Sequence, residues 1–347
     1  MYFWLPVIAA LLIALLATPA AIRLAHKVGA VDIPNARKVH TGAMPRLGGL
    51  GIYAGFVVGT ILMGVFSRQV FALLVTGSMV MAVGLYDDMK GISPKGKLLG
   101  QLIAAILLAQ SGFYIDFITN PFSGGVISLG IFAMPISVLW MVGMSNAVNL
   151  VDGLDGLSAG ISAIAALTIA VICFTRGDMT TCTLAAVLAA AAFGFLRYNF
   201  HPAKTFMGDC GSLFLGFTLG ALAINGFSKG ATIISIFIPF LIMGIPIFDT
   251  IFAIIRRKFL KKPIFEADKG HLHHCLLSCG LSHSQAVLVI YAICLTMGIA
   301  AVLMAVLTTS QAVLVLICII FLTFWGADKI GVLRGTKKSR LQKQSMK

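Results

Sequence analysis

Residues 2–22 read YFWLPVIAALLIALLATPAAI, an apolar run without a charged side chain. As a helix, a run of this length crosses the roughly 30 Å hydrocarbon layer of a bilayer. Arg23, His26 and Lys27 follow it directly, whereas no basic residue precedes it. Because a cleaved signal peptide carries its basic residues in front, we expect a retained membrane helix with the N-terminus outside.

Similar runs recur along the whole chain. Of its 347 residues, 59% are hydrophobic and 11% are charged, whereas soluble domains average about 25% charged residues. Further runs lie at residues 48–66, 70–86, 97–113, 131–148, 156–174, 181–196, 211–226, 231–250, 284–307 and 311–326. They are continuous rather than alternating, which excludes a transmembrane β-barrel. The sequence therefore predicts an all-α polytopic membrane protein with about 11 transmembrane helices, which form one integral-membrane domain over residues 1–347.

The basic residues predict how this domain is oriented. With the N-terminus outside, the cytoplasmic segments hold 23 of the 26 Lys and Arg residues, and the outside segments hold Arg68, Arg176 and Lys229. Cytoplasmic loops are enriched in Lys and Arg, so the C-terminus is expected in the cytoplasm. Residues 327–347 would form a basic cytoplasmic tail near anionic lipid. The net charge of +14 has the same explanation and requires no nucleic acid.

Acidic and amide residues gather on the predicted cytoplasmic side, where carboxylates near a membrane indicate function. One pair, Asp87 and Asp88, ends a predicted span, and Asp209 begins another. A second group recurs every three residues, so that neighbouring members share a helix face; it comprises Asn146, Asn149, Asp152 and Asp155. Oxygen ligands beside loops rich in Lys and Arg predict a hard cation such as Mg²⁺ among the acids and a polyanion among the bases.

Three of these acids each have two interpretations. Asp209 lies between glycines at the start of a span, where it suits an N-cap as well as a metal ligand. Asp87 and Asp88 would point about 100° apart on a helix, so the two cannot address one ion equally. Either one of them faces the site while the other holds a neighbouring Lys, or the pair is a solvated end of the span. The alternatives for all three acids stay open at this point.

Four motifs in chain order resemble a known family. They are Asp87-Asp88 with Lys97-Leu98-x-x-Gln101, the series from Asn146 to Leu157, Phe206-Met207-Gly208-Asp209 with Ser212, and His271-Leu272-His273-His274. This order resembles the polyprenyl-phosphate N-acetylhexosamine-1-phosphate transferases, which make the first lipid-linked sugar of cell-envelope polymers. The segments Arg37-Lys38-Val39-His40 and Pro45-Arg46 resemble the branch that uses UDP-N-acetylglucosamine (UDP-GlcNAc) for teichoic acid, the O-antigen of lipopolysaccharide or common antigen.

The resemblance implies a reaction, a cofactor and a location. Undecaprenyl phosphate would attack the β-phosphate of UDP-GlcNAc, which releases UMP and leaves undecaprenyl-pyrophosphoryl-GlcNAc. Mg²⁺, or Mn²⁺ in its place, would neutralise the diphosphate. A soluble nucleotide would meet a membrane lipid at the cytoplasmic face of the bacterial cytoplasmic membrane. UDP-GlcNAc, undecaprenyl phosphate and surrounding membrane lipid are thus the expected partners, and a homodimer stays open.

The resemblance also implies roles by position. The expected catalytic residues are Asp87, Asp88 and Asp209, and the expected Mg²⁺ ligands are Asp209 and Asn149. The expected substrate-binding residues are Lys97, Asn146, Asp152, Asp155, Arg46, His271, His273 and His274. One acid of the Asp87-Asp88 pair would orient or deprotonate the lipid phosphate, with Lys97 as its counter-charge. The histidines would contact the sugar or a phosphate.

Two other functions compete with this one. A phospho-N-acetylmuramoyl-pentapeptide transferase of peptidoglycan synthesis shares the motifs, although that branch usually lacks the Arg-Lys-x-His and Pro-Arg run. A polyprenyl-lipid transporter would show inverted repeats and charge at the bilayer midplane. The sequence shows neither feature, and its acids gather on one face.

Overall fold

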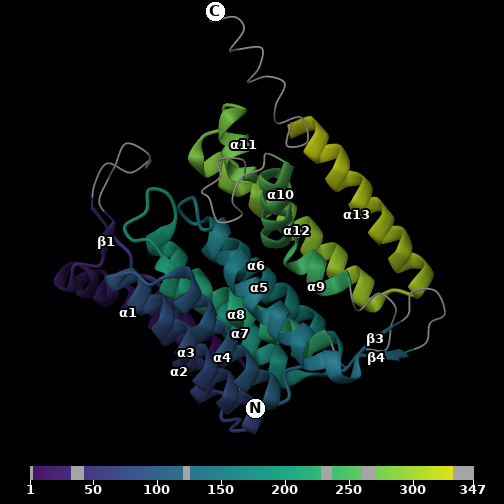
Figure 1. The fold of residues 1–347 in the computed structure, drawn as a ribbon, viewed down its shortest axis with the longest axis horizontal. Helices are drawn as coiled ribbons and strands as arrows, with labels where there is room; N and C mark the ends of the chain where they lie inside the picture. The colour runs from purple at the N-terminus through teal and green to yellow at the C-terminus, as the bar shows by residue number, and fades with distance from the viewer. Residues whose placement is uncertain (1–2, 33–42, 120–125, 228–236, 260–270, 331–347) are drawn as a thin grey trace, which may run out of the picture.

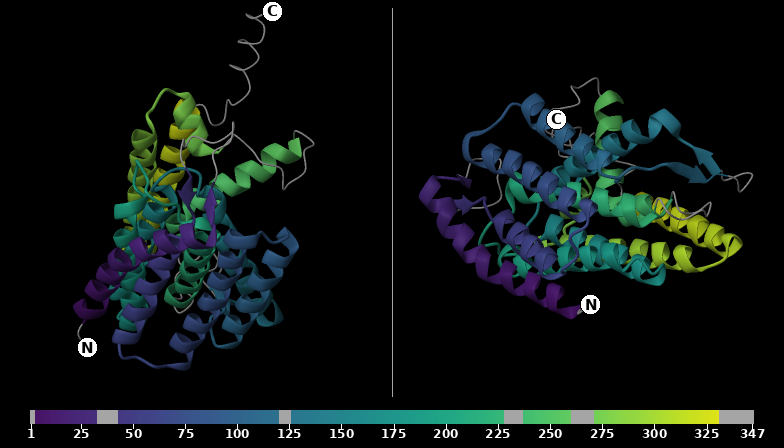
Figure 2. Two further views of the ribbon diagram at one scale, coloured as in Figure 1. Left: turned by 90° about the vertical axis from the view of Figure 1, so that its left-hand side faces the viewer. Right: turned by 90° about the horizontal axis from the view of Figure 1, so that it is seen from below.

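The computed structural model describes residues 3–32, 43–119, 126–227, 237–259 and 271–330, which form a helical bundle with two short hairpins (Figure 1). In chain order, its helices are α1 (Trp4–Val28), α2 (Gly49–Leu62), α3 (Arg68–Lys90), α4 (Pro94–Gln110), α5 (Ala133–Val151), α6 (Leu157–Thr175), α7 (Met179–Asn199), α8 (Gly208–Phe227), α9 (Phe237–Ile242), α10 (Gly244–Phe259), α11 (Leu272–Ser278), α12 (His283–Val306) and α13 (Thr309–Ile330). A single 3-10 turn, Gly130–Phe132, precedes α5. Helix α1 lies at one edge of the bundle and α13 at the opposite edge (Figure 2).

Both hairpins are antiparallel and short. In the first, β1 (Val31–Asp32) pairs with β2 (Met44–Pro45). In the second, β3 (Phe117–Thr119) pairs with β4 (Val126–Ser128). The first hairpin leads into α2, and the second leads through the 3-10 turn into α5.

Six helical segments of the described residues are long and apolar enough to cross a membrane. They are Trp4–Val28, Arg68–Lys90, Gly130–Val151, Leu157–Thr175, Met179–Asn199 and His283–Val306, and two shorter apolar helical stretches are Gly49–Leu62 and Ser310–Thr323. Large apolar side chains such as Leu16, Leu139 and Ile299 are exposed on the outside of the bundle. Lipid tails are as apolar as these side chains, so such a surface is stable when it faces the membrane. The prediction of a polytopic helical membrane protein is confirmed at this level.

The predicted spans correspond to helices with one difference. The predicted span 231–250 contains a short helix, α9, and the start of α10, with Met243 between them. Residues 231–236 of that span lie outside the described residues, as do Arg37, Lys38, His40 and most of the basic tail. The count of 11 spans and their orientation remain predictions.

Helix α8 lies at the centre of the bundle, against α2, α3, α5, α6 and α7. Every residue from Cys210 to Gly226 is buried, as expected of a helix that is apolar on all sides. Glycine permits the close approach of α3, because a Cβ on Gly84 would lie 2.5 Å from the Cα of Cys210. This contact brings the end of α3 to the start of α8, which carries Asp209.

The turn between α3 and α4 brings the start of α4 back towards the start of α8. Gly91 ends α3 with a positive φ of 73°, a conformation that glycine adopts without strain. Ser93 then caps α4 by accepting the backbone N–H of Gly96 at 3.2 Å. As a result Lys97, in the first turn of α4, lies beside Asp87.

Candidate active site

A cleft of about 670 Å³ opens around the start of α8. Many of the predicted site residues line it, namely Arg46, Asp88, Asn149, Asp152, Asp155, Asp209 and His274. Other lining residues come from the end of α7, from the segment between α7 and α8 and from the first residue of α12; they include Asn199, His201, Phe206 and His283. The cleft therefore gathers segments that are far apart in the sequence.

Beside this cleft, Lys97 joins two acids. Its Nζ lies 2.5 Å from Oδ2 of Asp87 and also donates a hydrogen bond to Oδ2 of Asp209. The second oxygen of Asp209 accepts a hydrogen bond from Nδ2 of Asn149 at 3.0 Å. Nδ2 of Asn149 also donates to the hydroxyl of Ser212 at 2.8 Å. Four helix ends thus meet at the carboxylate of Asp209, namely the ends of α3 and α5 and the starts of α4 and α8.

The adjacent Asp88 has different partners. Its two oxygens accept the backbone N–H groups of Asp209 at 3.0 Å and of Cys210 at 2.9 Å. Asp88 therefore satisfies amides at the start of α8, which lack partners within their own helix. The carboxylate of Asp209, in contrast, points to Lys97 and Asn149. Of the pair, Asp87 shares Lys97 with Asp209, whereas Asp88 holds the helix that carries Asp209.

Helix α5 ends one residue before Asp152, so two predicted acids lie in a loop, residues 152–156, called the acidic loop below. Loss of hydration raises the pKa of Asp152 to about 8. The negative charges of Asp209, Asp88 and Asp155 contribute to this shift. A bound cation would relieve this excess of negative charge, and carboxylate and amide oxygens are the ligands that suit Mg²⁺. The residues present therefore fit the expected cofactor.

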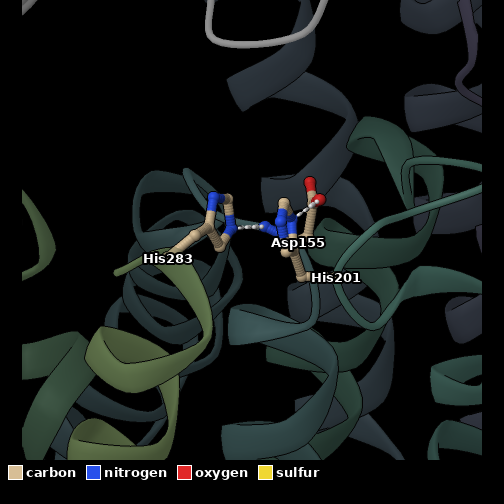
Figure 3. Close-up of side chains that lie close together, drawn as sticks. All are labelled: Asp155, His201 and His283. Carbon is tan, nitrogen blue, oxygen red and sulfur yellow. Dashed lines mark hydrogen bonds and ion pairs between the residues drawn. The ribbon is translucent and has the colours of Figure 1, made fainter. Parts of the chain in front are cut away.

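Asp155 links the acidic loop to two other segments (Figure 3). Its Oδ2 accepts hydrogen bonds from Nδ1 of His201 at 2.8 Å and from the backbone N–H of Ala203 at 3.1 Å. Its own backbone N–H donates to Nε2 of His283 at 2.9 Å. The rings of His201 and His283 stack with their centroids 4.4 Å apart.

Of the three predicted histidines, two are buried and pack within the protein, and one lines the cleft. His271 is buried, and its Nδ1 lies 2.7 Å from Oδ2 of Asp249 on α10. His273 is also buried and packs on the acidic loop, where a Cβ on Gly153 would lie 2.7 Å from its Nε2. Burial, together with the neighbouring His274, lowers the pKa of His273 to about 4, so His273 carries no positive charge at neutral pH. His274 is the member that lines the cleft.

Two further predicted substrate-binding residues have partners within the protein. Arg46 lies at the cleft, 3.6 Å from Oδ1 of Asp32. Asn146 lies one turn before Asn149, and its Nδ2 donates to Oε1 of the fully buried Gln101 at 2.5 Å. Asn146 is therefore placed to support the site from the α4–α5 interface.

Sequence reasoning did not single out His201, His283, Asn199 or Asp249 as site residues. A signal was nevertheless present for His201, which precedes Pro202 in the short segment leading to the Asp209 motif. His283 lies at the start of a predicted span, in the position that Ser282 caps. No spacing in the sequence relates either histidine to Asp155, because each contact joins separate elements.

Comparison with known proteins places this site in a family. The sequence pattern of glycosyl transferase family 4 matches residues 70–227. A probable undecaprenyl-phosphate N-acetylglucosaminyl 1-phosphate transferase of Bacillus subtilis is 47% identical over 298 residues, covering 86% of this chain and 83% of that protein. The chain belongs to glycosyl transferase family 4. The family-4 match runs from α3 to the end of α8 and includes Asp87, Lys97, Asn149 and Asp209.

Other relatives differ in the activity that their names state. A decaprenyl-phosphate N-acetylglucosaminephosphotransferase of Mycolicibacterium smegmatis is 38% identical over 298 residues, covering 77% of this chain and 73% of that protein. A phospho-N-acetylmuramoyl-pentapeptide-transferase of Halalkalibacterium halodurans is 35% identical over 284 residues, covering 76% of this chain and 84% of that protein. The family predicted from the four motifs is thus confirmed.

Proposed function

We propose that this protein transfers GlcNAc-1-phosphate from UDP-GlcNAc to undecaprenyl phosphate and releases UMP. The observation that carries the proposal is the meeting of Lys97, Asp87, Asn149 and Asp209 beside a cleft in a bundle of apolar helices. Two relatives named for GlcNAc-1-phosphate transfer, at 47% and 38% identity, are more similar than the pentapeptide transferase at 35%. The similarity therefore supports GlcNAc as the sugar.

The proposed reaction exchanges one phosphoanhydride for another. An oxygen of the lipid phosphate forms a bond to the β-phosphorus of UDP-GlcNAc, and the bond from that phosphorus to the bridging oxygen of UMP breaks. A phosphate monoester has a second pKa near about 6, so the attacking oxygen is already mostly ionised at neutral pH. The main task of the protein is then to hold the lipid phosphate in line with the diphosphate of UDP-GlcNAc and to stabilise the negative charge of the transition state. We assign Asp87 to orienting the lipid phosphate and Lys97 to balancing its charge.

Mg²⁺ is the proposed cofactor, with Mn²⁺ as a substitute, and Asp209 and Asn149 are its proposed ligands. When bound, the ion supplies the positive charge that stabilises the diphosphate as negative charge builds on the leaving UMP. The acidic loop is assigned to the nucleotide side of the cleft. Arg46 and His274, which line the cleft, are assigned to the sugar or a phosphate.

The cleft is proposed to face the cytoplasm, in a chain with 11 spans and its N-terminus outside. The split of basic residues supports this orientation. Single cysteines introduced at positions 95 and 204 should then react with a membrane-impermeant maleimide only in inverted vesicles. Cysteines at positions 68 and 177 should react from the outside of intact cells. Labelling of position 204 in intact cells would contradict the orientation and the proposed face of the site.

Donor choice tests the proposed function. Purified protein with Mg²⁺ and undecaprenyl phosphate should convert labelled UDP-GlcNAc to a labelled lipid. The muramyl-pentapeptide nucleotide should be used with a kcat/KM lower by about 100-fold or more, because a site shaped for one sugar leaves polar groups unpaired with another. The two values of kcat/KM are measured side by side. Equal or better use of the muramyl-pentapeptide nucleotide would assign the protein to peptidoglycan synthesis instead.

A further inference from the structure

Helix α12 holds the acidic loop at two points. At the start of α12, Nε2 of His283 accepts the backbone N–H of Asp155 at 2.9 Å. Two turns further along, the hydroxyl of Tyr291 donates to the carbonyl of Gly156 at 2.5 Å. Helical residues eight apart lie on one face, so a single face of α12 contacts the loop. The ring of Tyr291 occupies the space that a side chain at Gly160 would need.

The loop is also bonded to the end of α7 and to the segment that follows α7. The backbone N–H of Gly156 donates to Oδ1 of Asn199 at 3.1 Å. The carboxylate of Asp155 accepts from His201 and from the N–H of Ala203. The acidic loop is therefore held by two parts of the chain, of which α12 is one.

The geometry of the histidines identifies how this anchor works. One ligand atom each from Asp155, His201 and His283 lies within 4.8 Å of the others, an arrangement that suggests a metal site (Figure 3). However, Nε2 of His283 already accepts a backbone N–H. The two rings are also stacked with 15° between their planes, and lone pairs in nearly parallel planes do not converge on one ion. The arrangement is that of a hydrogen-bonded anchor.

We propose that His283 is a positioning residue that fixes the acidic loop through the Asp155 N–H and thereby sets the affinity for the nucleotide donor. The identity of that donor rests on the proposed function, whereas the anchoring of the loop does not. His283 lies beyond residues 70–227, so the anchor comes from outside the part of the chain that the family pattern matches. The lipid acceptor is assigned to Asp87 and Lys97, and its binding should not depend on His283.

Two substitutions distinguish the effect of the ring of His283 from the effect of its acceptor nitrogen. His283→Phe keeps a ring that can stack on His201 but has no acceptor, whereas His283→Gln offers an amide oxygen to the Asp155 N–H. We expect His283→Phe to raise the KM for UDP-GlcNAc about tenfold, because it leaves a backbone N–H unpaired. The KM for undecaprenyl phosphate should stay within about twofold, and His283→Gln should recover most of the donor affinity. An unchanged donor KM, or an equal rise in both KM values, would overturn the proposal.

Hydrogen exchange over residues 150–157 gives a readout that does not require activity. In detergent, His283→Phe should speed exchange in this peptide by roughly tenfold, and His283→Gln should exchange nearly as slowly as the wild type. Ser282→Ala is the matched control, since Ser282 caps α12 by accepting the N–H of Gln285 and makes no hydrogen bond to the loop among the described residues. If Ser282→Ala speeds loop exchange as much as His283→Phe, fraying of α12 explains the effect and the proposal is overturned.

The two readouts also distinguish this proposal from the proposed function. Faster loop exchange in His283→Phe, with no use of UDP-GlcNAc by the wild type, would support the anchor and refute the proposed donor. Turnover of UDP-GlcNAc by the wild type, with unchanged exchange and donor KM in His283→Phe, would refute the anchor alone.

Discussion

Asp209→Asn is expected to lower kcat by about 10²–10⁴, on the order of 3–5 kcal/mol of transition-state stabilisation. Asn keeps the shape of Asp209 and one oxygen, but it removes the charge that faces Lys97 and that would hold Mg²⁺ against the diphosphate. The measurement is kcat at saturating substrates, with a Mg²⁺ titration for each variant. Removal of divalent ions with EDTA should abolish turnover by the wild type.

The chain offers a matched control at another helix start. Asp178 caps α7 by accepting the backbone N–H of Thr181 at 3.0 Å. Because Asn is nearly as good a cap as Asp, Asp178→Asn should stay near wild-type activity and stability. Near wild-type turnover of Asp209→Asn, with an unchanged Mg²⁺ requirement, would exclude a metal-ligand role for Asp209.

Asp87→Asn is expected to lose activity, whereas Asp88→Ala is expected to lose stability. Asp87→Asn should lower kcat by about 10² or more with little change in Tm, because Asp87 shares Lys97 with Asp209 and is assigned to the lipid phosphate. Asp88→Ala should lower the free energy of unfolding by about 1–3 kcal/mol for each amide it leaves unpaired at the start of α8. Both variants are compared by kcat and by thermal unfolding in detergent.

The opposite pattern would contradict the assignment of the pair. A stable Asp88→Ala variant together with an unfolded Asp87→Asn variant would mean that Asp87 holds α8. Lys97→Met offers an internal check, because it leaves Asp87 and Asp209 as like charges without their shared cation. It should therefore lose activity as Asp87→Asn does.

The helices of the bundle were predictable because each apolar run is close to the length of a membrane span. The polar series after residue 145 was predictable only in part. Neighbours three residues apart drift by about 60° on a helix, and this drift places Asn146 against Gln101 while Asn149 contacts Asp209. The series then leaves the helix, so Asp152 and Asp155 belong to a loop.

The contacts that complete the site could not be read from local spacing. Asp88 reaches amides more than a hundred residues later in the chain, and the approach of α3 to α8 at Gly84 permits it. His201 and His283 meet only because α12 lies against the acidic loop. Contacts of this kind depend on the packing of whole helices, about which a single sequence carries little information.

The most direct test of the proposed reaction follows two labels through one turnover. UDP-GlcNAc carrying ¹⁴C in the sugar and ³²P at the β-phosphorus is incubated with the purified protein, Mg²⁺ and undecaprenyl phosphate. Transfer of GlcNAc-1-phosphate predicts that both labels enter the lipid in the starting ratio and that unlabelled UMP is released. A lipid that carries ¹⁴C without ³²P, with labelled UDP in solution, would contradict phosphosugar transfer and indicate transfer of the sugar alone.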